Sequence, residues 1–278
     1  MSESSSSQWQ RLLQNVGTWQ GSFTQISAQG NILSDVPTEV ALIPQDGGQA
    51  MRQEIHRYPS GSPAQTQVLE YRNLSRATLF FADGAFSQGS TQWGPFSQFG
   101  AELGFIAGER RLRLVQLFNK SSELAQITLI REQLKGSNAP ERPTLTLSDL
   151  LGTWQGEAVT QYADLRPEQR QTSELTVEAI SDGQIRQTIV FDESLPPVRS
   201  IGTISGQTIL FTAGTQPVQV LLLPDGASAT CPLKIAPRQP LFLEAGWLIE
   251  ANTRQRMIRS YDAAGAWISL TLVTERRA

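Results

Sequence analysis

The sequence predicts an all-β protein made of two tandem antiparallel β-barrels, each preceded by a short helix. Three observations lead to this prediction: an internal repeat, closely spaced strand and turn patterns, and a Gly-Thr-Trp unit after a short helical pattern in each copy. The length of 278 residues allows one large domain or two small ones. The repeat favours two.

The repeat is visible at both ends of the two copies. Residues 17–21 (Gly-Thr-Trp-Gln-Gly) recur without change at residues 152–156. Residues 113–118 align with 256–261, and in the same register residues 127–132 align with 270–275. The offset grows from 135 to 143, which indicates a net insertion of eight residues in the second copy. We therefore expect a disordered tail over residues 1–8, a barrel over 9–134, a linker over 135–148 and a second barrel over 149–278.

Each copy opens with a short helical pattern. In the first copy, apolar residues recur at helical spacing between Trp9 and Val16. In the second copy, Ser148 or Asp149 can cap a single turn that ends at Leu151.

Alternating apolar and polar residues predict strands in the remainder of both copies. Turn signals such as Asp83-Gly84 and Asp225-Gly226 separate them. Strands at this spacing predict an up-and-down antiparallel sheet, which forms either a barrel or a sandwich. The predicted strands are Thr38–Ile43, Val68–Tyr71, Thr78–Phe81, Leu112–Phe118, Ala125–Arg131, Glu174–Ala179, Ile185–Phe191, Thr208–Phe211, Val218–Leu223, Leu241–Ile249, Met257–Tyr261 and Trp267–Val273.

The Gly-Thr-Trp unit favours the barrel. A short helix can close one end of a barrel, the glycine lets the backbone pass closely, and the indole fills the closed end. An arginine from a late strand often stacks on such a ring. Trp19 with Arg113, and Trp154 with Arg256, are therefore predicted as the two structural barrel-end pairs.

The first copy also resembles a known family. Gly-x-Trp at the first strand resembles the lipocalin (calycin) pattern. Residues 80–90 (Phe-Phe-Ala-Asp-Gly-Ala-Phe-Ser-Gln-Gly-Ser), 93–102, 110–115 and 129–132 resemble DUF3598, a cyanobacterial family of tandem lipocalin-like proteins with a domain of unknown function. The resemblance covers roughly residues 17–132 and extends to the second half through the repeat. It implies two fused eight-stranded-type barrels and a photosynthetic bacterial source, and it carries no reaction over.

The segment Phe80–Glu102 is the densest in aromatic residues. Glycine allows a flat ligand to approach the backbone, while serine and glutamine can orient its polar groups. The alternative is a hairpin whose aromatic side chains close the barrel core. We recognise no version of this segment in the second copy, so the predicted pocket lies in the first barrel. The candidate ligand-binding residues are Phe81, Phe86, Ser87, Gln92, Trp93, Phe96, Phe99 and Arg113.

Arginines cluster on a late strand of each copy. Arginine forks could hold carboxylates, such as tetrapyrrole propionates or a fatty-acid head group. The alternative is a solvated strand edge with one arginine over the barrel-end tryptophan. The set comprises Arg110, Arg111 and Arg113 beside Glu102 and Glu109 in the first copy, and Arg254, Arg256 and Arg259 in the second.

Composition limits the chemistry. The net charge of −3 gives no basic field for nucleic acid. One histidine (His56) and one cysteine (Cys231) cannot form a Cys/His zinc cage. His56 and Glu54 share a strand face, but no nucleophile is placed beside them, and Cys231 is expected to be an inert thiol. No metal site, catalytic residue or cofactor is predicted, apart from a bound pigment or lipid.

No apolar run reaches the length of roughly 20 residues that a membrane helix needs, and no signal core follows the serine-rich start. The sequence thus predicts a cytoplasmic protein. Its leading function is binding of a hydrophobic or amphipathic small molecule (a pigment, bilin, carotenoid or lipid) in the first barrel. The alternatives are a calycin-like lyase or chaperone acting on tetrapyrroles, and a non-catalytic assembly module with a photosynthetic protein as its partner.

Overall fold

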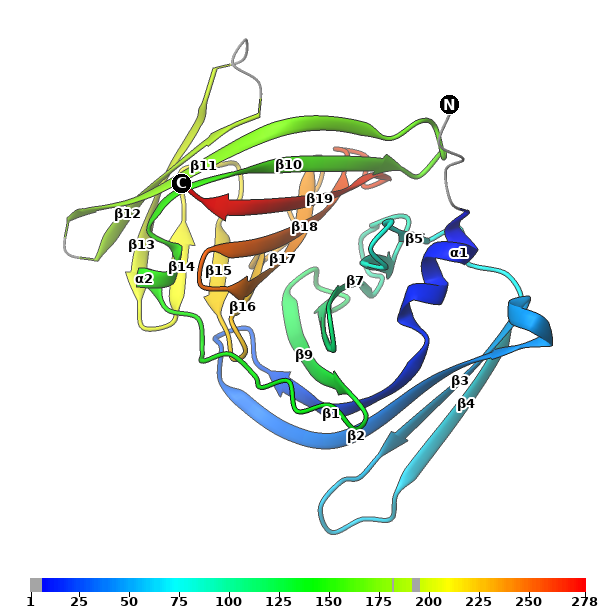
Figure 1. Ribbon diagram of the computed structural model, residues 1–278. Helices are drawn as coiled ribbons and strands as arrows, with labels where there is room; N and C mark the ends of the chain where they lie inside the picture. The colour runs from blue at the N-terminus through cyan, green and yellow to red at the C-terminus, as the bar shows by residue number, and fades with distance from the viewer. Residues whose placement is uncertain (1–6, 182, 192–195) are drawn as a thin grey trace.

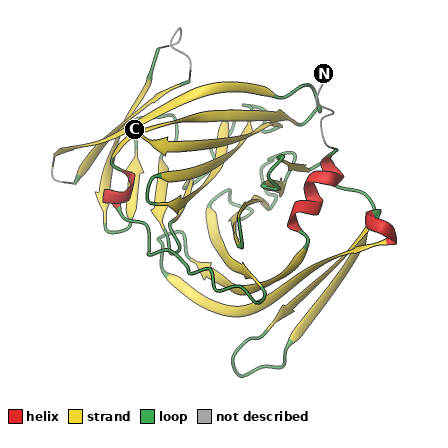
Figure 2. Ribbon diagram, in the orientation of Figure 1, coloured by secondary structure: helices red, strands yellow, loops and turns green. Residues whose placement is uncertain are grey.

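The computed structural model describes residues 7–181, 183–191 and 196–278, which form two curved antiparallel sheets with a few short helices (Figures 1 and 2). The first sheet is open and has nine strands, and the second closes into a barrel of ten strands. The predicted fold class is confirmed: the chain is all-β, with two tandem barrel-like sheets that each follow a short helix. The strand numbers differ from the eight that the resemblance implied.

The first sheet curls from one edge strand, β4, to the other, β5. The strand order is β4-β3-β2-β1-β9-β8-β7-β6-β5, so β1 pairs with both β2 and β9 near the middle of the sheet. The strands are β1 (Gly17–Ile26), β2 (Ile32–Gln45), β3 (Ala50–Arg57), β4 (Gln65–Tyr71), β5 (Thr78–Phe80), β6 (Phe86–Gly89), β7 (Phe99–Ala107), β8 (Arg110–Phe118) and β9 (Leu124–Leu134).

The second sheet is a complete up-and-down barrel. Each strand pairs with the next in the chain, and β10 pairs with β19 to close the barrel. Its strands are β10 (Gly152–Tyr162), β11 (Gln169–Ser181), β12 (Gln184–Val190), β13 (Val198–Ser205), β14 (Thr208–Phe211), β15 (Val218–Leu222), β16 (Ala227–Pro232), β17 (Leu241–Glu250), β18 (Thr253–Tyr261) and β19 (Trp267–Arg277).

Short helices precede both sheets. α1 (Gln8–Leu12) starts at Ser7, whose hydroxyl accepts from the backbone N–H of Gln10. A disordered tail was predicted for residues 1–8. Residues 1–6 lie outside the described part of the chain, while Ser7 caps α1 and Gln8 is its first residue. Thr146 is the N-cap of α2 (Leu147–Leu150). Two 3-10 turns, η1 (Leu13–Asn15) and η2 (Asp46–Gly48), complete the described helices.

Apolar residues gather in three clusters. One fills the concave side of the first sheet around Trp19 and Met51, and another fills the closed end of the second barrel around Trp154. The largest lies where β7, β8 and β9 pack against β16 to β19. In this cluster the Phe99 ring lies 4.9 Å from the Tyr261 ring, and the Phe105 ring 6.3 Å from the Trp247 ring. The two barrels therefore share a core.

Polar contacts cross the same boundary. Arg110 of β8 forms an ion pair with Asp225, in the turn between β15 and β16. The Tyr261 hydroxyl donates to the Ser90 carbonyl at 2.8 Å, and the Gln116 amide donates to the Glu244 carbonyl at 3.0 Å. Across the described part of the chain, we find no helix with the length and hydropathy needed to cross a membrane.

Candidate functional site

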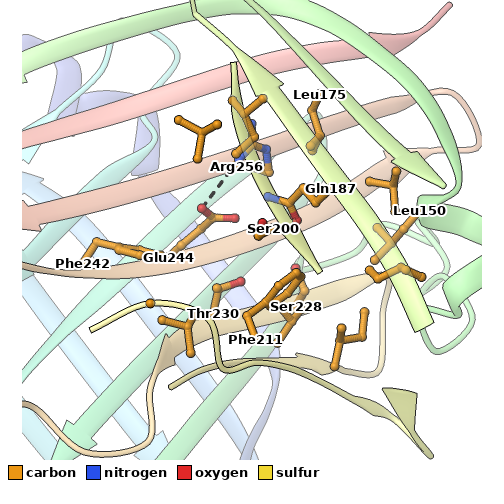
Figure 3. A pocket seen from close by; sticks show the side chains of 18 of the residues that line it. Leu150, Leu175, Gln187, Ser200, Phe211, Ser228, Thr230, Phe242, Glu244 and Arg256 are labelled. Atoms are coloured by element: carbon orange, nitrogen blue, oxygen red, sulfur yellow. Dashed lines mark ion pairs between the residues drawn. The ribbon is translucent and has the colours of Figure 1, made fainter. Parts of the chain in front are cut away.

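The closed barrel holds a cavity of about 400 Å³ between its walls (Figure 3). Apolar side chains from β11 to β15 form much of the wall, and Leu150 of α2 lies at one end. Figure 3 shows Glu244 and Arg256 on the opposite side, joined by an ion pair. The labelled lining residues are Leu150, Leu175, Gln187, Ser200, Phe211, Ser228, Thr230, Phe242, Glu244 and Arg256.

Two arginines and two glutamates form a charge quartet in this wall. The Nε of Arg254 donates to Glu275 at 2.6 Å, and the Nε of Arg256 donates to the same carboxylate at 3.0 Å. Arg256 also faces Glu244, whose Oε2 lies 3.6 Å from its Nη1. We call these four residues the second quartet.

Burial and charge act differently on the two carboxylates. Burial would raise the pKa of Glu275, but the guanidiniums of Arg256 and Arg254 outweigh it and hold that pKa below its usual value. For Glu244 burial wins over the attraction of Arg256, so its pKa lies above the usual value. Glu244 is therefore the member of the second quartet that is most easily protonated, and it lines the cavity.

The first sheet carries a matching first quartet of Glu102, Arg111, Arg113 and Glu132. Arg111 Nε donates to Glu132 at 2.7 Å, and Arg113 Nη2 lies 3.0 Å from the other oxygen of that carboxylate. Arg113 also donates to Glu102 at 2.7 Å. Arg111 and Arg113 are thus buried within ion pairs and do not form a solvated strand edge.

An arginine does lie over the barrel-end tryptophan in each copy. The Arg111 guanidinium is 4.5 Å from the Trp19 ring, while Arg254 and Arg277 are each 4.6 Å from the Trp154 ring. Each indole N–H donates at 3.0 Å to the carbonyl four residues earlier in the chain.

The predicted partners of these rings lie two residues farther along β8 and β18. Arg113 is 5.4 Å from the Phe23 ring, and it bridges the two glutamates of the first quartet. Arg256 bridges Glu244 and Glu275 in the same way. Arg111 stacks on Trp19 instead, and Arg254 and Arg277 stack on Trp154.

The open sheet has a groove of about 510 Å³ at the gap between its edges, which we call the β4–β5 groove. Leu69 and Tyr71 of β4 line one side, and Thr78 and Phe80 of β5 line the other. Arg113 reaches both this groove and an adjoining space of about 70 Å³, which Phe86 also lines.

The structure distributes the other predicted ligand-binding residues over different surroundings. Phe81, Trp93 and Phe99 belong to the apolar cluster shared by the two barrels. Phe96 is 83% exposed. Only Phe86 and Arg113 of the predicted set are brought together at a cavity of the first barrel.

Ser87 and Gln92 lie at the boundary between the barrels. The Ser87 hydroxyl donates to the Glu102 carbonyl at 2.8 Å, and the Gln92 amide donates to the Ala264 carbonyl at 2.8 Å. Both side chains therefore have protein partners.

His56 and Cys231 lie outside both cavities. The Nδ1 of His56 is 3.0 Å from the Thr66 hydroxyl, and its Nε2 is 3.5 Å from Glu54. Cys231 is buried in the shared cluster, and burial raises the pKa of its thiol to about 12. The described residues contain no group of three His, Cys, Asp or Glu side chains placed to hold a metal ion.

The sequence pointed to Glu102 beside the first arginine cluster, but not to the other three glutamates of the quartets, although signals for them were present. Glu132 and Glu275 are identical residues at the end of the aligned segments 127–132 and 270–275. Glu102 lies opposite Val115 on β8, and Glu244 lies opposite Ile258 on β18, which are matched positions in the repeat. Asp-Gly-Ala at 83–85 also recurs at 225–227. The second copy therefore contains the turn of the segment Phe80–Glu102, although its aromatic residues are not repeated there.

Fold and cavities together define an all-β protein in which a curled open sheet is followed by a closed β-barrel with a cavity. The N-terminal model of the DUF3598 family (domain of unknown function) matches residues 5–137. A crystal structure of a DUF3598-family protein of unknown function from Nostoc punctiforme is 48% identical, with a TM-score of 0.93, and the match covers 98% of this chain and 100% of that chain. The chain belongs to the DUF3598 family.

Other comparisons are narrower. The model of the C-terminal domain of biogenesis factor required for ATP synthase 1 matches residues 141–278. The S-type phycobiliprotein lyase CPES of Guillardia theta matches 47% of this chain and 89% of that chain, with 12% identity and a TM-score of 0.38. A comparison with the curated proteins finds no match.

Proposed function

We propose that the protein binds a hydrophobic or amphipathic small molecule inside the closed second barrel. The observation that carries this proposal is the cavity of about 400 Å³, which combines largely apolar walls with one charged group made of Glu244, Arg254 and Arg256. Its volume lies in the range of roughly 300–1,000 Å³ that small-molecule sites have. Sequence reasoning placed the ligand in the first barrel, whose β4–β5 groove is open along a sheet edge.

The charge balance of the second quartet favours an anionic head group. Two arginines face two glutamates, and the 3.6 Å separation of Glu244 from Arg256 is longer than a direct hydrogen bond. Burial raises the pKa of Glu244, so this carboxyl is the member of the second quartet that we expect to take up a proton when a ligand carboxylate binds beside it. One net positive charge then remains, and a ligand carboxylate that accepts from Arg256 neutralises it. A fatty acid or a bilin propionate has this chemistry, and a carotenoid hydrocarbon does not.

Isothermal titration calorimetry with oleate, biliverdin and β-carotene tests the proposal. We expect saturable binding of at least one carboxylate ligand at one site per chain, with proton uptake on binding. Ser200→Trp places an indole in the cavity and should abolish binding. Arg199→Trp on the exposed face of the same strand is the control and should retain it. Equal binding by both variants, or no binding of any carboxylate ligand, would contradict the proposal.

A second candidate function is a non-catalytic role in complex assembly, with the protein staying in the cytoplasm. The supporting observation is the match of residues 141–278 to the C-terminal domain of a biogenesis factor required for ATP synthase. Surface plasmon resonance of the immobilised full chain against purified ATP synthase subunits tests it. Reproducible binding of one subunit is the expected result, and absence of binding by every subunit would exclude this role.

A further inference from the structure

The two sheets differ by one strand, and the position of that strand is defined by the repeat. The order of the first sheet and that of the second barrel match if β1–β4 correspond to β10–β13 and β5–β9 to β15–β19. β14 then has no counterpart. Between β4 and β5 there are six residues, 72–77, whereas twelve residues, 206–217, separate β13 from β15 and include β14. The extra chain length in the second copy therefore closes its barrel.

β14 shows what kind of segment would fill the corresponding position between β4 and β5 in the first sheet. It is a four-residue strand that pairs antiparallel with β13 on one side and β15 on the other. Two of its alternate side chains, Ile209 and Phe211, point into the cavity. Gly202 of β13 leaves room for both, because a Cβ there would come within 2.6 Å of Ile209 and 2.9 Å of Phe211. An extended segment with two apolar residues at alternate positions fits the slot.

β4 leaves this position unpaired in the first sheet. It has seven residues, and its outer edge has no backbone partner within the described parts of the chain. Proteins usually protect such an edge with lysine, proline or a bulge. β4 has none of these, and its one charged residue, Glu70, is paired with Arg52. The unpaired backbone N–H and C=O groups on the outer edge of β4 can therefore form hydrogen bonds with another strand.

The inner face of β4 is also exposed. Leu69 lines the β4–β5 groove and is 42% exposed, although its side chain faces the concave side of the sheet. Val68, its neighbour on the opposite face, is 41% exposed. An added strand beside β4 would cover Leu69 and would leave Val68 in solvent.

The opposite edge is already occupied. The side chain of Gln8 accepts from the Phe80 N–H at 2.6 Å and donates to the Phe80 carbonyl at 3.2 Å. These two bonds replace those that a neighbouring strand would make to β5. The incoming strand must therefore pair with β4, and α1 bounds the groove on the far side.

We propose that the first sheet binds an extended peptide segment of a partner protein by strand addition to β4. The peptide runs antiparallel to β4 and places two alternate apolar side chains in the β4–β5 groove, as β14 does in the second barrel. Main-chain hydrogen bonds to the free edge supply affinity, and the groove selects the side chains. This inference concerns the other barrel and stands or falls independently of ligand binding in the closed one.

A peptide with the sequence of residues 207–213 (Gln-Thr-Ile-Leu-Phe-Thr-Ala) is the direct probe. Fluorescence anisotropy of the labelled peptide with the full-length protein should show saturable binding. Leu69→Arg should weaken it by at least about tenfold, because an unpaired charge would have to be buried in the groove. Val68→Arg, with matched exposure on the outer face, should change it less than about twofold. Equal effects of the two variants, or no binding, would count against the proposal.

A second variant tests the slot without any external peptide. Replacing residues 72–77 by the sequence of residues 206–217 supplies a strand in the chain itself. Hydrogen exchange should then show protection of the β4 amides that point away from β3, and the peptide should no longer bind. Unprotected β4 amides in this variant would overturn the proposal. Sedimentation that shows β4-dependent dimers would also overturn it, because the occupant would then be a second copy of this chain. Oleate binding in the β4–β5 groove without protection of the β4 amides would overturn it as well, because the groove would then be a small-molecule site.

Discussion

Arg111 donates a hydrogen bond of 2.7 Å to Glu132 in a part of the first sheet where neither side chain reaches solvent. The same relationship joins Arg254 to Glu275 in the second barrel. Each of these arginines also stacks on the tryptophan of its Gly-Thr-Trp unit. One buried glutamate in each copy thus holds the arginine that closes the end of the barrel.

The ion pairs of Glu132 with Arg111 and Arg113 predict that the free energy of unfolding falls at low pH. Burial would raise the pKa of Glu132, but Arg111 and Arg113 outweigh it and lower that pKa from 4.5 to about 2. The folded-state pKa is depressed, so the stabilisation of about 3 kcal/mol is present above pH 4.5 and is lost as the pH falls towards 2. Urea unfolding between pH 2 and pH 7 measures it.

Glu132→Gln should remove this dependence. It should lower the free energy of unfolding at pH 7 by about 3–5 kcal/mol, because two buried guanidiniums lose their shared partner. Glu157→Gln, at an exposed ion pair, is the control and should change it by less than about 1 kcal/mol. An unchanged pH dependence in Glu132→Gln would show that this carboxylate does not couple protonation to folding.

The last glycine of the repeated pentapeptide predicts a steric effect in both copies. A Cβ on Gly21 would lie 1.8 Å from the Arg131 carbonyl oxygen, and one on Gly156 would lie 2.2 Å from that of Thr274. Alanine at either position should destabilise the protein by about 3 kcal/mol or more in thermal or urea unfolding. Gly94→Ala, where the nearest atom is 3.9 Å away, should be nearly neutral. Tolerance of both core substitutions would refute the close approach of the first and last strands.

The buried thiol of Cys231 predicts slow labelling. Burial raises its pKa to about 12, so almost no thiolate exists at pH 8. A thiol reagent such as DTNB should leave the native protein unlabelled and should modify one thiol per chain after unfolding in guanidinium. Rapid stoichiometric labelling of the native protein would mean that the barrel–barrel contact opens readily.

Gln8 predicts a local effect at the β5 edge. Gln8→Ala removes both hydrogen bonds to the Phe80 backbone and should cost about 1–2 kcal/mol. Hydrogen exchange should show faster loss of the Phe80 amide proton. Gln29→Ala, on an exposed loop, should leave that rate unchanged. An unaltered Phe80 rate in Gln8→Ala would indicate that other groups protect this edge.

Alternation of apolar and polar residues finds strands whose two faces differ in exposure. Glu174–Ala179 and Trp267–Val273, for example, overlap β11 and β19, in which buried residues alternate with more exposed ones. β16 was missed because all six of its residues are buried and its small side chains give only a weak contrast between the two faces. β7 was missed for the same reason, since both of its faces are largely covered. Contact between the barrels removes the periodicity on which the prediction depends.

The sequence predicts which residue types form the site, but it does not predict which arginine faces which partner. The arginine cluster and the barrel-end tryptophans are visible in the sequence, but the choice between Arg111 and Arg113 over Trp19 depends on strand pairing that the repeat does not specify. The aromatic segment divides between two environments for a similar reason. Phe86 faces the inside of its own sheet, while Phe99 packs against the other barrel. Those faces are set by tertiary contact.

The core shared between the barrels has a consequence for the history of the chain. A duplicated unit begins as a separable module that can be lost, exchanged or copied again. Here the largest apolar cluster is built from both copies, with residues such as Leu103 and Leu243 fully excluded from solvent. Deleting either copy would expose that cluster to water and invite aggregation. Neither repeat can therefore be removed without uncovering apolar surface on the other.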